Sequence, residues 1–577
     1  YQKALSALQS ISTIRRRKGD RITIKEDSRG SKLKKLEDSI ATLDNLQSKA
    51  VIETVEGVQR IRGLAGSGKT IVLALKAAYL HAQHPSWNIA VTFNTRSLKA
   101  QFRSLIYRFS VEQTGEEPDW SRIKVLNAWG APGGEERDGL YHQFCKIHNA
   151  SYFDFRTARS QFGKSNPFEM ACSQAISSLD YTHSTEHSYN VILVDEAQDL
   201  PFSFLRLCYE FLDDKKRLVY AYDELQRLSE MSLAPPEEIF GRDSEGKPRV
   251  QFTEPLAGQP RPDIILEKCY RNSRPVLITA HALGFGIYRK SPLSQQIGLI
   301  QMFDNSTLWK DIGYEVSGGK LQDGLKVTLR RKPEASPDFL ENHSNLEDLI
   351  QFLPFENELQ QNEWLANSIE RNLKEDELLP EDIIVINPDP LTTRKKVGEI
   401  RHILMQKGIR SHLAGVDTDP DVFFQTGSSI TFTGIFRAKG NEAGMVYIIN
   451  SQDCNSASQS LNLANIRNRL FTAITRSKAW IRVLGVGSGM INLIEEFKEL
   501  EQNNFELSFQ YPTKEERMRL SIVHRDTTVE EQKIINRRTK NLKDLIADVK
   551  SGRLYPEDID EEDREQLIEI LMSGKSQ

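Results

Sequence analysis

The feature that most constrains the fold is a glycine-rich segment between an apolar strand-like run and an apolar helix-like run. Residues 58–62 (VQRIR) precede GLAGSGKT, which has the spacing G-x-x-x-x-G-K-T, and the helix-forming run IVLALKAAYL follows. Glycine permits backbone dihedrals and close approaches that a Cβ would block, and N–H groups at a helix N-terminus bind phosphate. The segment therefore predicts a strand–loop–helix unit that cradles phosphate groups with Gly63, Gly66, Ser67, Gly68, Lys69 and Thr70.

An acidic pair that matches this loop follows a second apolar run. The run NVILVD (190–195) ends in Asp195 and is followed by Glu196. In a phosphate-loop enzyme, Lys69 neutralises β- and γ-phosphate oxygens, and the Thr70 hydroxyl together with Asp195 holds Mg²⁺. Glu196 is then placed to activate the attacking water as general base. The two segments together predict hydrolysis of ATP with Mg²⁺ as cofactor.

Short β-rich runs alternate with helical stretches along most of the chain. This alternation is typical of βαβ units, in which helices cover both faces of a parallel sheet. The runs fall into two groups, from VQRIR (58–62) to RLVYAY (217–222) and from DIIVIN (382–387) to AWIRVLGV (479–486). We therefore expect an α/β protein with a charged N-terminal helical segment (1–42), a first domain (43–257), a second domain (258–510) with an insertion at about 285–355, and a charged helical C-terminal segment (511–577).

Composition excludes several classes of protein. No run of about 18 apolar residues and no signal-peptide pattern occurs, so we expect neither a membrane partner nor secretion. The five cysteines are far apart and form no C-x-x-C pair, which argues against a zinc site and for a reducing, cytoplasmic location. With 76 Lys and Arg against 80 Asp and Glu, the net charge of −4 excludes a uniformly basic coat. It does not exclude a local basic and aromatic groove for a polyanion.

The residues after the second apolar run read D-E-A-Q-D (195–199), which resembles the second helicase motif of the superfamily 1, UvrD/Rep-like helicases. Segments that resemble other motifs of this family follow in family order. LDNLQSKAV (43–51) is similar to the adenine-reading Q motif, with Gln47 as the reader. TFNTRSLKAQ (92–101) resembles the first strand-contacting motif and places Phe93 and Asn94 near nucleic acid. AYDELQ (221–226) resembles motif III, in which Gln226 couples the γ-phosphate to the bound strand.

Three further segments lie in the predicted second domain. CYRNSRP (269–275) resembles motif IV, so that Tyr270 stacks on adenine and Arg271 reaches the γ-phosphate. FTGIFRAKGNEAGMVYI (432–448) is similar to motif V, with Lys439 near the nucleic-acid backbone and Glu442 near the ribose. NRLFTAITRSKAW (468–480) resembles motif VI, in which Arg476 is a second arginine at the γ-phosphate.

The resemblance implies two RecA-like domains with ATP in the cleft between them. It further implies a helicase or translocase that moves 3′ to 5′ on single-stranded nucleic acid, for which we favour DNA over RNA. Two departures from the family bear on strand binding. No tryptophan follows Gln226, and Phe436 and Arg437 stand near the place of the usual motif V histidine. Trp129, in VLNAWG, is the candidate replacement for the stacking tryptophan, although a partly buried packing role explains it equally well.

Two alternatives remain open at the level of the sequence. An ATP-gated nucleic-acid sensor could regulate a fused or partner nuclease, for example in bacterial antiviral defence, without efficient unwinding. The start at Tyr1 without methionine and the lack of a large accessory domain motivate this alternative. A small-molecule phosphate-loop kinase would leave the later motifs unexplained. The basic runs at 15–18 and 32–35 predict either a solvated helix face or a phosphate-contacting arm.

Overall fold

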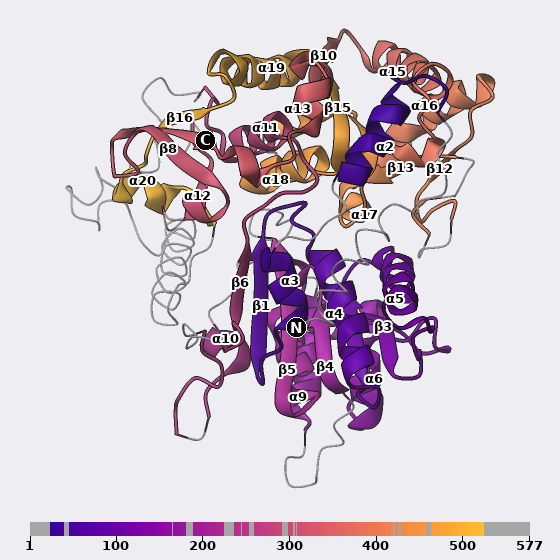
Figure 1. Ribbon diagram of the computed structural model, residues 1–577, viewed down its shortest axis with the longest axis vertical. Helices are drawn as coiled ribbons and strands as arrows, with labels where there is room; N and C mark the ends of the chain where they lie inside the picture. Colours follow the sequence, from indigo (N-terminus) through magenta and orange to yellow (C-terminus); the bar gives the residue numbers. More distant parts are fainter. Residues whose placement is uncertain are drawn as a thin grey trace, which may run out of the picture.

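The chain folds around two parallel β-sheets, and the helices that connect successive strands cover them (Figure 1). The computed structural model describes residues 23–39, 45–163, 166–179, 189–223, 236–243, 245–252, 259–290, 298–303, 306, 308–418, 422–424, 429–456 and 463–523. Strands buried on both faces have continuous apolar sequences, which is why the runs seen in the sequence become neighbouring parallel strands. The predicted α/β class with two RecA-like parallel sheets is confirmed.

The first sheet has six parallel strands in the order β3-β2-β4-β5-β1-β6. With its flanking helices we call it the first domain. Its strands are β1 (Val58–Gly63), β2 (Ile89–Phe93), β3 (Ile123–Asn127), β4 (Tyr189–Val194), β5 (Leu212–Asp223) and β6 (Asp263–Leu266). Its helices include α3 (Asn45–Ile52), α4 (Lys69–Gln83), α5 (Leu98–Thr114), α6 (Leu140–Ile147), α7 (Phe155–Phe162), α8 (Pro167–Ser177), α9 (Phe202–Glu210) and α10 (Pro236–Phe240).

The second sheet, the centre of the second domain, also has six parallel strands, in the order β10-β15-β14-β11-β13-β12. They are β10 (Ile350–Phe355), β11 (Ile383–Asn387), β12 (Ser411–Leu413), β13 (Ile430–Gly434), β14 (Ala443–Ile448) and β15 (Ser477–Val486). The helices of this domain include α11 (Arg274–Phe285), α15 (Glu358–Lys374), α16 (Thr393–Gln406), α17 (Ile435–Ala438), α18 (Leu463–Ile474) and α19 (Gly487–Gln502).

The segment predicted as an insertion contributes to a smaller sheet. β8 (Tyr314–Gly319) and β9 (Lys326–Arg331) pair antiparallel, and β16 (Leu507–Gln510) adds to the free edge of β9. Further on, β17 (Ser521–Val523) pairs with β7 (Gln301–Phe303). The short helices here are α12 (Leu308–Asp311), α13 (Phe339–His343), α14 (Leu346–Leu349) and α20 (Lys514–Arg519). The part of 511–577 that the structure describes thus includes a strand as well as a helix, and residues 524–577 lie outside the described residues.

Two positions differ from the expected domain division. β6 pairs with β1 in the first sheet, although the sequence placed residues after 257 in the second domain. β10 forms an edge of the second sheet, although residues up to about 355 were expected to belong to the insertion. Both are edge strands, and their pairing partners are distant in sequence, so local patterning gave little sign of either.

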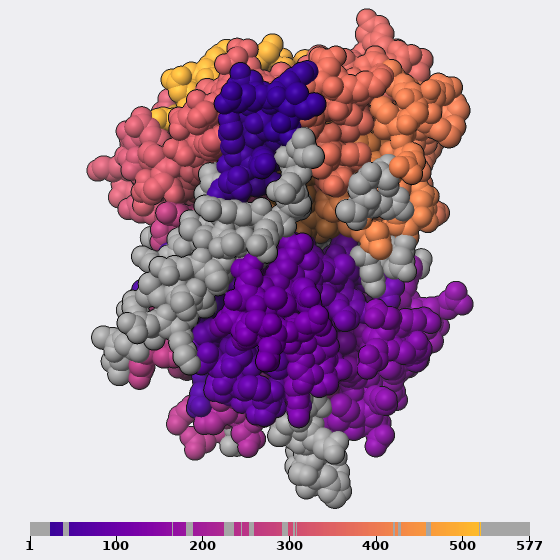
Figure 2. Space-filling view, turned by 45° about the vertical axis from the view of Figure 1, so that its right-hand side comes forward, coloured from indigo at the N-terminus to yellow at the C-terminus, as the bar shows by residue number. Residues whose placement is uncertain are grey.

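The N-terminal helix α2 (Arg29–Ser39) lies on the second domain, whereas the next helix, α3, packs on the first (Figures 1 and 2). Leu33 and Leu36 are fully buried in the core around the second sheet. The Arg29 guanidinium pairs with Asp348 and Asp376. Around the basic run 32–35, the helix therefore buries Leu33 and Leu36 on one face and exposes Lys34 and Lys35 on the other. The run at 15–18 lies outside the described residues. Among the described helices, none has the length and apolar composition that crossing a bilayer requires.

Candidate active site

The phosphate loop lies where β1 ends and α4 begins, as its sequence predicts. Gly66 and Gly68 have φ angles of +76° and +85°, which side chains rarely adopt. A Cβ on Gly66 would lie 2.6 Å from the Cβ of Arg271, and a Cβ on Gly68 would lie 2.7 Å from Nε2 of Gln47. Glycine at these two positions therefore permits both the positive φ angles of the loop and the close approach of Arg271 and Gln47.

The loop contains groups suited to phosphate. The Ser67 hydroxyl is buried and has no hydrogen-bond partner within the described residues. The Lys69 ammonium donates to the carbonyl oxygens of Gly63 and Leu64, at 2.9 Å each, and lies 3.6 Å from Asp223. An unpartnered buried hydroxyl and a lysine that bends back over its own loop fit a nucleotide phosphate chain.

The residues predicted to hold the metal lie side by side. Thr70 Oγ1 donates to Asp195 Oδ2 at 2.7 Å, and Asp195 follows directly after β4. Burial and the neighbouring Glu196 raise the pKa of Asp195 to about 7. A hydroxyl and a carboxylate at the phosphate loop fit Mg²⁺, which prefers oxygen ligands and keeps several waters alongside substrate phosphates.

Glu196 lies among cations from both domains. Its backbone has a φ of +51°, an uncommon conformation that points to a constrained position. Burial opposes its ionisation, but Lys439, Lys69 and Arg476 lower its pKa on balance. Gln198 donates to the Glu196 carboxylate and accepts from the Asp223 backbone N–H. The carboxylate is thus held ionised, the state that a general base requires.

Two arginines of the second domain reach this cluster. Tyr270 N–H donates to the Gly66 carbonyl at 2.8 Å, which brings Arg271 against the phosphate loop. The Arg271 guanidinium pairs with Glu442 and also donates to the Thr475 carbonyl at 3.2 Å. Arg476 is 1% exposed, and burial together with Arg271 lowers its pKa to about 10 against the opposing effect of Glu196.

Glu442, expected near the ribose, faces basic side chains. Besides Arg271, it lies 3.7 Å from the Lys478 ammonium, which in turn pairs with Glu37 of α2 at 3.0 Å. Burial opposes its ionisation, but Arg271 and Lys478 lower the pKa of Glu442 to about 2. In this structure Glu442 therefore holds the arginine. Lys478 lies in the segment that resembles motif VI but was assigned no role there, and Glu37 lies in none of the motifs.

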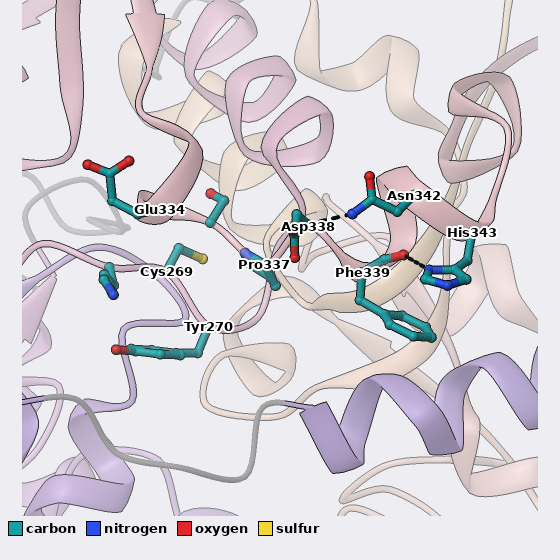
Figure 3. A pocket seen from close by; sticks show the side chains of 10 residues that line it. Cys269, Tyr270, Glu334, Pro337, Asp338, Phe339, Asn342 and His343 are labelled. Carbon is teal, nitrogen blue, oxygen red and sulfur yellow. Dashed lines mark hydrogen bonds between the residues drawn. The ribbon is translucent and has the colours of Figure 1, made fainter.

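A cavity of about 330 Å³ opens beside Tyr270, the predicted adenine-stacking residue. Figure 3 shows the side chains of Tyr270, Phe339 and His343 around it, the latter two from α13. Gln47 is fully buried nearby at the phosphate loop, where its Nε2 donates to the Ser67 carbonyl at 2.7 Å. The sequence did not predict that residues of α13 line this cavity, because the segment before β10 has no periodic pattern that indicates a binding site.

Three of the four predicted nucleic-acid contacts are buried or packed in the structure. Phe93, which was expected near nucleic acid, is fully buried and stacks on Phe102, with 5.5 Å between ring centroids, so its side chain presents no surface to a strand in this structure. Trp129 stacks on Phe168 at 4.4 Å and donates to the Phe153 carbonyl, which is the packing alternative.

The other two predicted contacts meet at one carboxylate. Lys439 is 2% exposed, and its ammonium lies 2.7 Å from both Asp199 carboxylate oxygens. Asn94 is exposed, and its amide donates to the Asp199 backbone carbonyl at 3.4 Å. Gln226 lies outside the described residues.

One segment of the chain matches the model of a known protein family. Residues 429–484, from the start of β13 through Lys439 and Arg476 to β15, match the model of the UvrD-like helicase C-terminal domain. No curated protein matches the chain in sequence.

Two solved structures show similarity to this chain. The C-terminal domain of a possible DNA helicase from Lactobacillus plantarum WCFS1 is 16% identical, with a TM-score of 0.20, over 27% of this chain and 83% of that chain. Dbp5 from S. cerevisiae, bound to RNA and ADP BeF3, is 10% identical, with a TM-score of 0.38, over 81% of this chain and 90% of that chain.

Proposed function

We propose that the chain is a UvrD/Rep-like helicase that hydrolyses ATP to move along single-stranded nucleic acid; the match of residues 429–484 to the UvrD-like helicase C-terminal domain supports this. We further propose DNA as the track in preference to RNA, and 3′ to 5′ movement, as the family resemblance implies. The observation that carries the proposal is the meeting of catalytic groups from two domains at one phosphate loop. Arg271 contacts Gly66 of the loop, and the charge of Arg476 acts on Glu196.

This arrangement supports a division of labour in hydrolysis. The loop N–H groups and Lys69 would bind the phosphate chain, and Thr70 and Asp195 would hold Mg²⁺, which when bound neutralises phosphate charge. Glu196 would accept the proton of the attacking water. Arg271 and Arg476 would stabilise the negative charge that develops on the transferred phosphoryl group.

Coupling to movement would follow from the same geometry. The two arginines stand on the second domain, so hydrolysis requires the two domains to approach each other. The Lys439–Asp199 pair joins the domains at the carboxylate cluster that contains Glu196. Asn94, next to Asp199, is exposed at the end of β2. Opening and closing at the nucleotide would therefore change the surface around Asn94, where a strand could be gripped.

The test compares ATP turnover with matched single-stranded DNA and RNA, followed by displacement of a strand from a tailed duplex. Lys69→Ala and Glu196→Gln should each abolish turnover, and Glu196→Gln should still bind ATP because it removes only the base. Wild-type turnover in either variant would contradict the site. Turnover stimulated by strands without displacement would instead support the alternative of a sensor that regulates a nuclease.

A further inference from the structure

Helix α2 lies outside every motif, yet it packs against the start of β14, the strand that directly follows Glu442. Leu33 of this helix is fully buried, and a Cβ on Gly444 would lie 2.4 Å from its Cδ2 atom. One residue earlier, the Ala443 N–H donates to the Arg476 carbonyl at 3.1 Å. The helix therefore rests on backbone that adjoins both Glu442 and a catalytic arginine.

Glu37, near the end of α2, begins a row of four side chains of alternating charge. Its carboxylate accepts from the Lys478 ammonium at 3.0 Å. That ammonium lies 3.7 Å from Glu442, and Glu442 pairs with Arg271. Arg271 in turn contacts Gly66 of the phosphate loop. The row thus leads from the N-terminal helix to the nucleotide site.

The first pair of the row is shielded from solvent. The side chains of Lys478 and Glu37 are only 18% and 22% exposed. Burial opposes protonation of Lys478, but Glu442 and Glu37 raise its pKa on balance. Charges in such surroundings interact more strongly than exposed surface pairs do. A change of charge at Glu37 should therefore be felt at Lys478 and Glu442.

Loss of the Glu37 charge would redistribute the contacts in this row. Lys478 lies within hydrogen-bonding distance of Glu37 but not of Glu442. Asp382, whose charge also acts on Lys478, already accepts from the Leu379 N–H at 2.8 Å. Without the negative charge of Glu37, the ammonium would move towards Glu442. That carboxylate would then be shared between the lysine and the arginine, which would loosen the hold on the arginine.

We propose that Glu37 and Lys478 are positioning residues that hold Glu442, and through it Arg271, in place for phosphoryl transfer. This inference rests on the proposed function, because it concerns the arginine that would stabilise the transferred phosphoryl group. It gives α2 a part in hydrolysis from outside the motifs. Displacement of α2 would slow turnover without removing any group that binds the phosphate chain.

The experiment measures steady-state ATP turnover of Glu37→Gln. Its kcat should fall about 3- to 30-fold, as coupling between neighbouring charges predicts, with little change in KM for ATP, because the arginine acts in the transition state. Hydrogen exchange in α2 should stay as in the wild type, since Leu33 and Leu36 remain buried. Asp38→Asn is the matched control: it removes the same charge from the exposed neighbouring position and should keep the wild-type kcat.

Two measurements separate positioning from a structural effect. ADP with aluminium fluoride mimics the transition state, so Glu37→Gln should weaken its binding by about the same factor as kcat while binding ADP alone like the wild type. Lys478→Met cuts the row at its second member. In that background, Glu37→Gln should cause no further loss of kcat, because the two changes act through one link.

Wild-type kcat in Glu37→Gln would overturn the inference and leave the ATPase assignment intact. So would an equal loss of affinity for ADP alone, faster exchange in α2 of this variant, or a further loss in the double variant. Absence of ATP turnover in the wild-type protein would instead overturn the proposed function itself.

Discussion

Replacement of Lys439 by methionine should weaken the association of the two domains where Lys439 meets the carboxylates of Glu196 and Asp199. The ammonium lies 2.7 Å from both oxygens of Asp199 and 3.7 Å from Glu196, and it is 2% exposed. At an effective dielectric constant of about 20, charges this close attract by about 6 kcal/mol before the cost of desolvation. Removing one partner of such a buried pair costs about 3–5 kcal/mol. Because the two partners lie on different domains, this free-energy cost destabilises the closed arrangement of the domains.

The expected result is a fall of about 100-fold or more in the equilibrium constant for domain closure, since about 1.4 kcal/mol corresponds to a factor of ten. Energy transfer between dyes on the two domains measures closure. All five native cysteines are buried, so dyes can be directed to cysteines introduced at Met170 and Met405, which are 46% and 65% exposed. Lys395→Met, which removes an exposed lysine from the second domain, is the matched control.

The double variant Lys439→Met, Asp199→Asn tests the cause. Replacing both partners removes the buried charge that the single variant leaves unpaired, so much of the closure should return. If Lys439→Met keeps the energy transfer and turnover of the wild type, the pair does not hold the domains together and the reasoning fails. A loss in the single variant that the double variant does not reduce would also contradict it.

Three further predictions concern nucleotide chemistry and the N-terminal helix. Since burial and Glu196 raise the pKa of Asp195 to about 7, its carboxyl is half ionised near that pH. Apparent Mg²⁺ affinity by calorimetry should therefore rise about fivefold from pH 6 to pH 7 and level off above about pH 8, and a flat profile would contradict this. Arg476→Ala should lower kcat by about 1,000-fold with a much smaller change in ATP binding, which stopped-flow binding and steady-state turnover separate. Leu33→Ala removes a fully buried side chain of α2 and should weaken its docking by about 2–5 kcal/mol, seen as faster hydrogen exchange in α2, whereas Lys35→Ala on the exposed face should leave exchange unchanged.

Much of the site could be predicted because its motifs depend on local backbone chemistry. The phosphate loop requires glycines at fixed spacing, and the structure shows positive φ at Gly66 and Gly68. Thr70 and Asp195 stand together because the carboxyl ends of β1 and β4 lie at the same edge of one parallel sheet. Such constraints act within a few residues of each motif, so the sequence reports them directly.

The strand-contacting residues were harder to predict because burial decides them. β2 is buried along its whole length, on both faces of the sheet. Alternation therefore carries no information about which side chain is exposed, and Phe93 packs beneath α5 while the next residue, Asn94, is exposed.

The sequence by itself determined the fold class, the phosphate loop and the acidic pair, because apolar patterning and backbone stereochemistry are local properties. Only the tertiary structure decided which distant segments meet. It placed α2 on the second domain, where Glu37 pairs with Lys478. Lys478 in turn lies beside Glu442, and Glu442 pairs with Arg271. It also brought Lys439 to Asp199 across the domain junction. The Glu37–Lys478 and Asp199–Lys439 pairs join residues 441 and 240 positions apart, and their energy comes from burial and charge pairing in the folded chain.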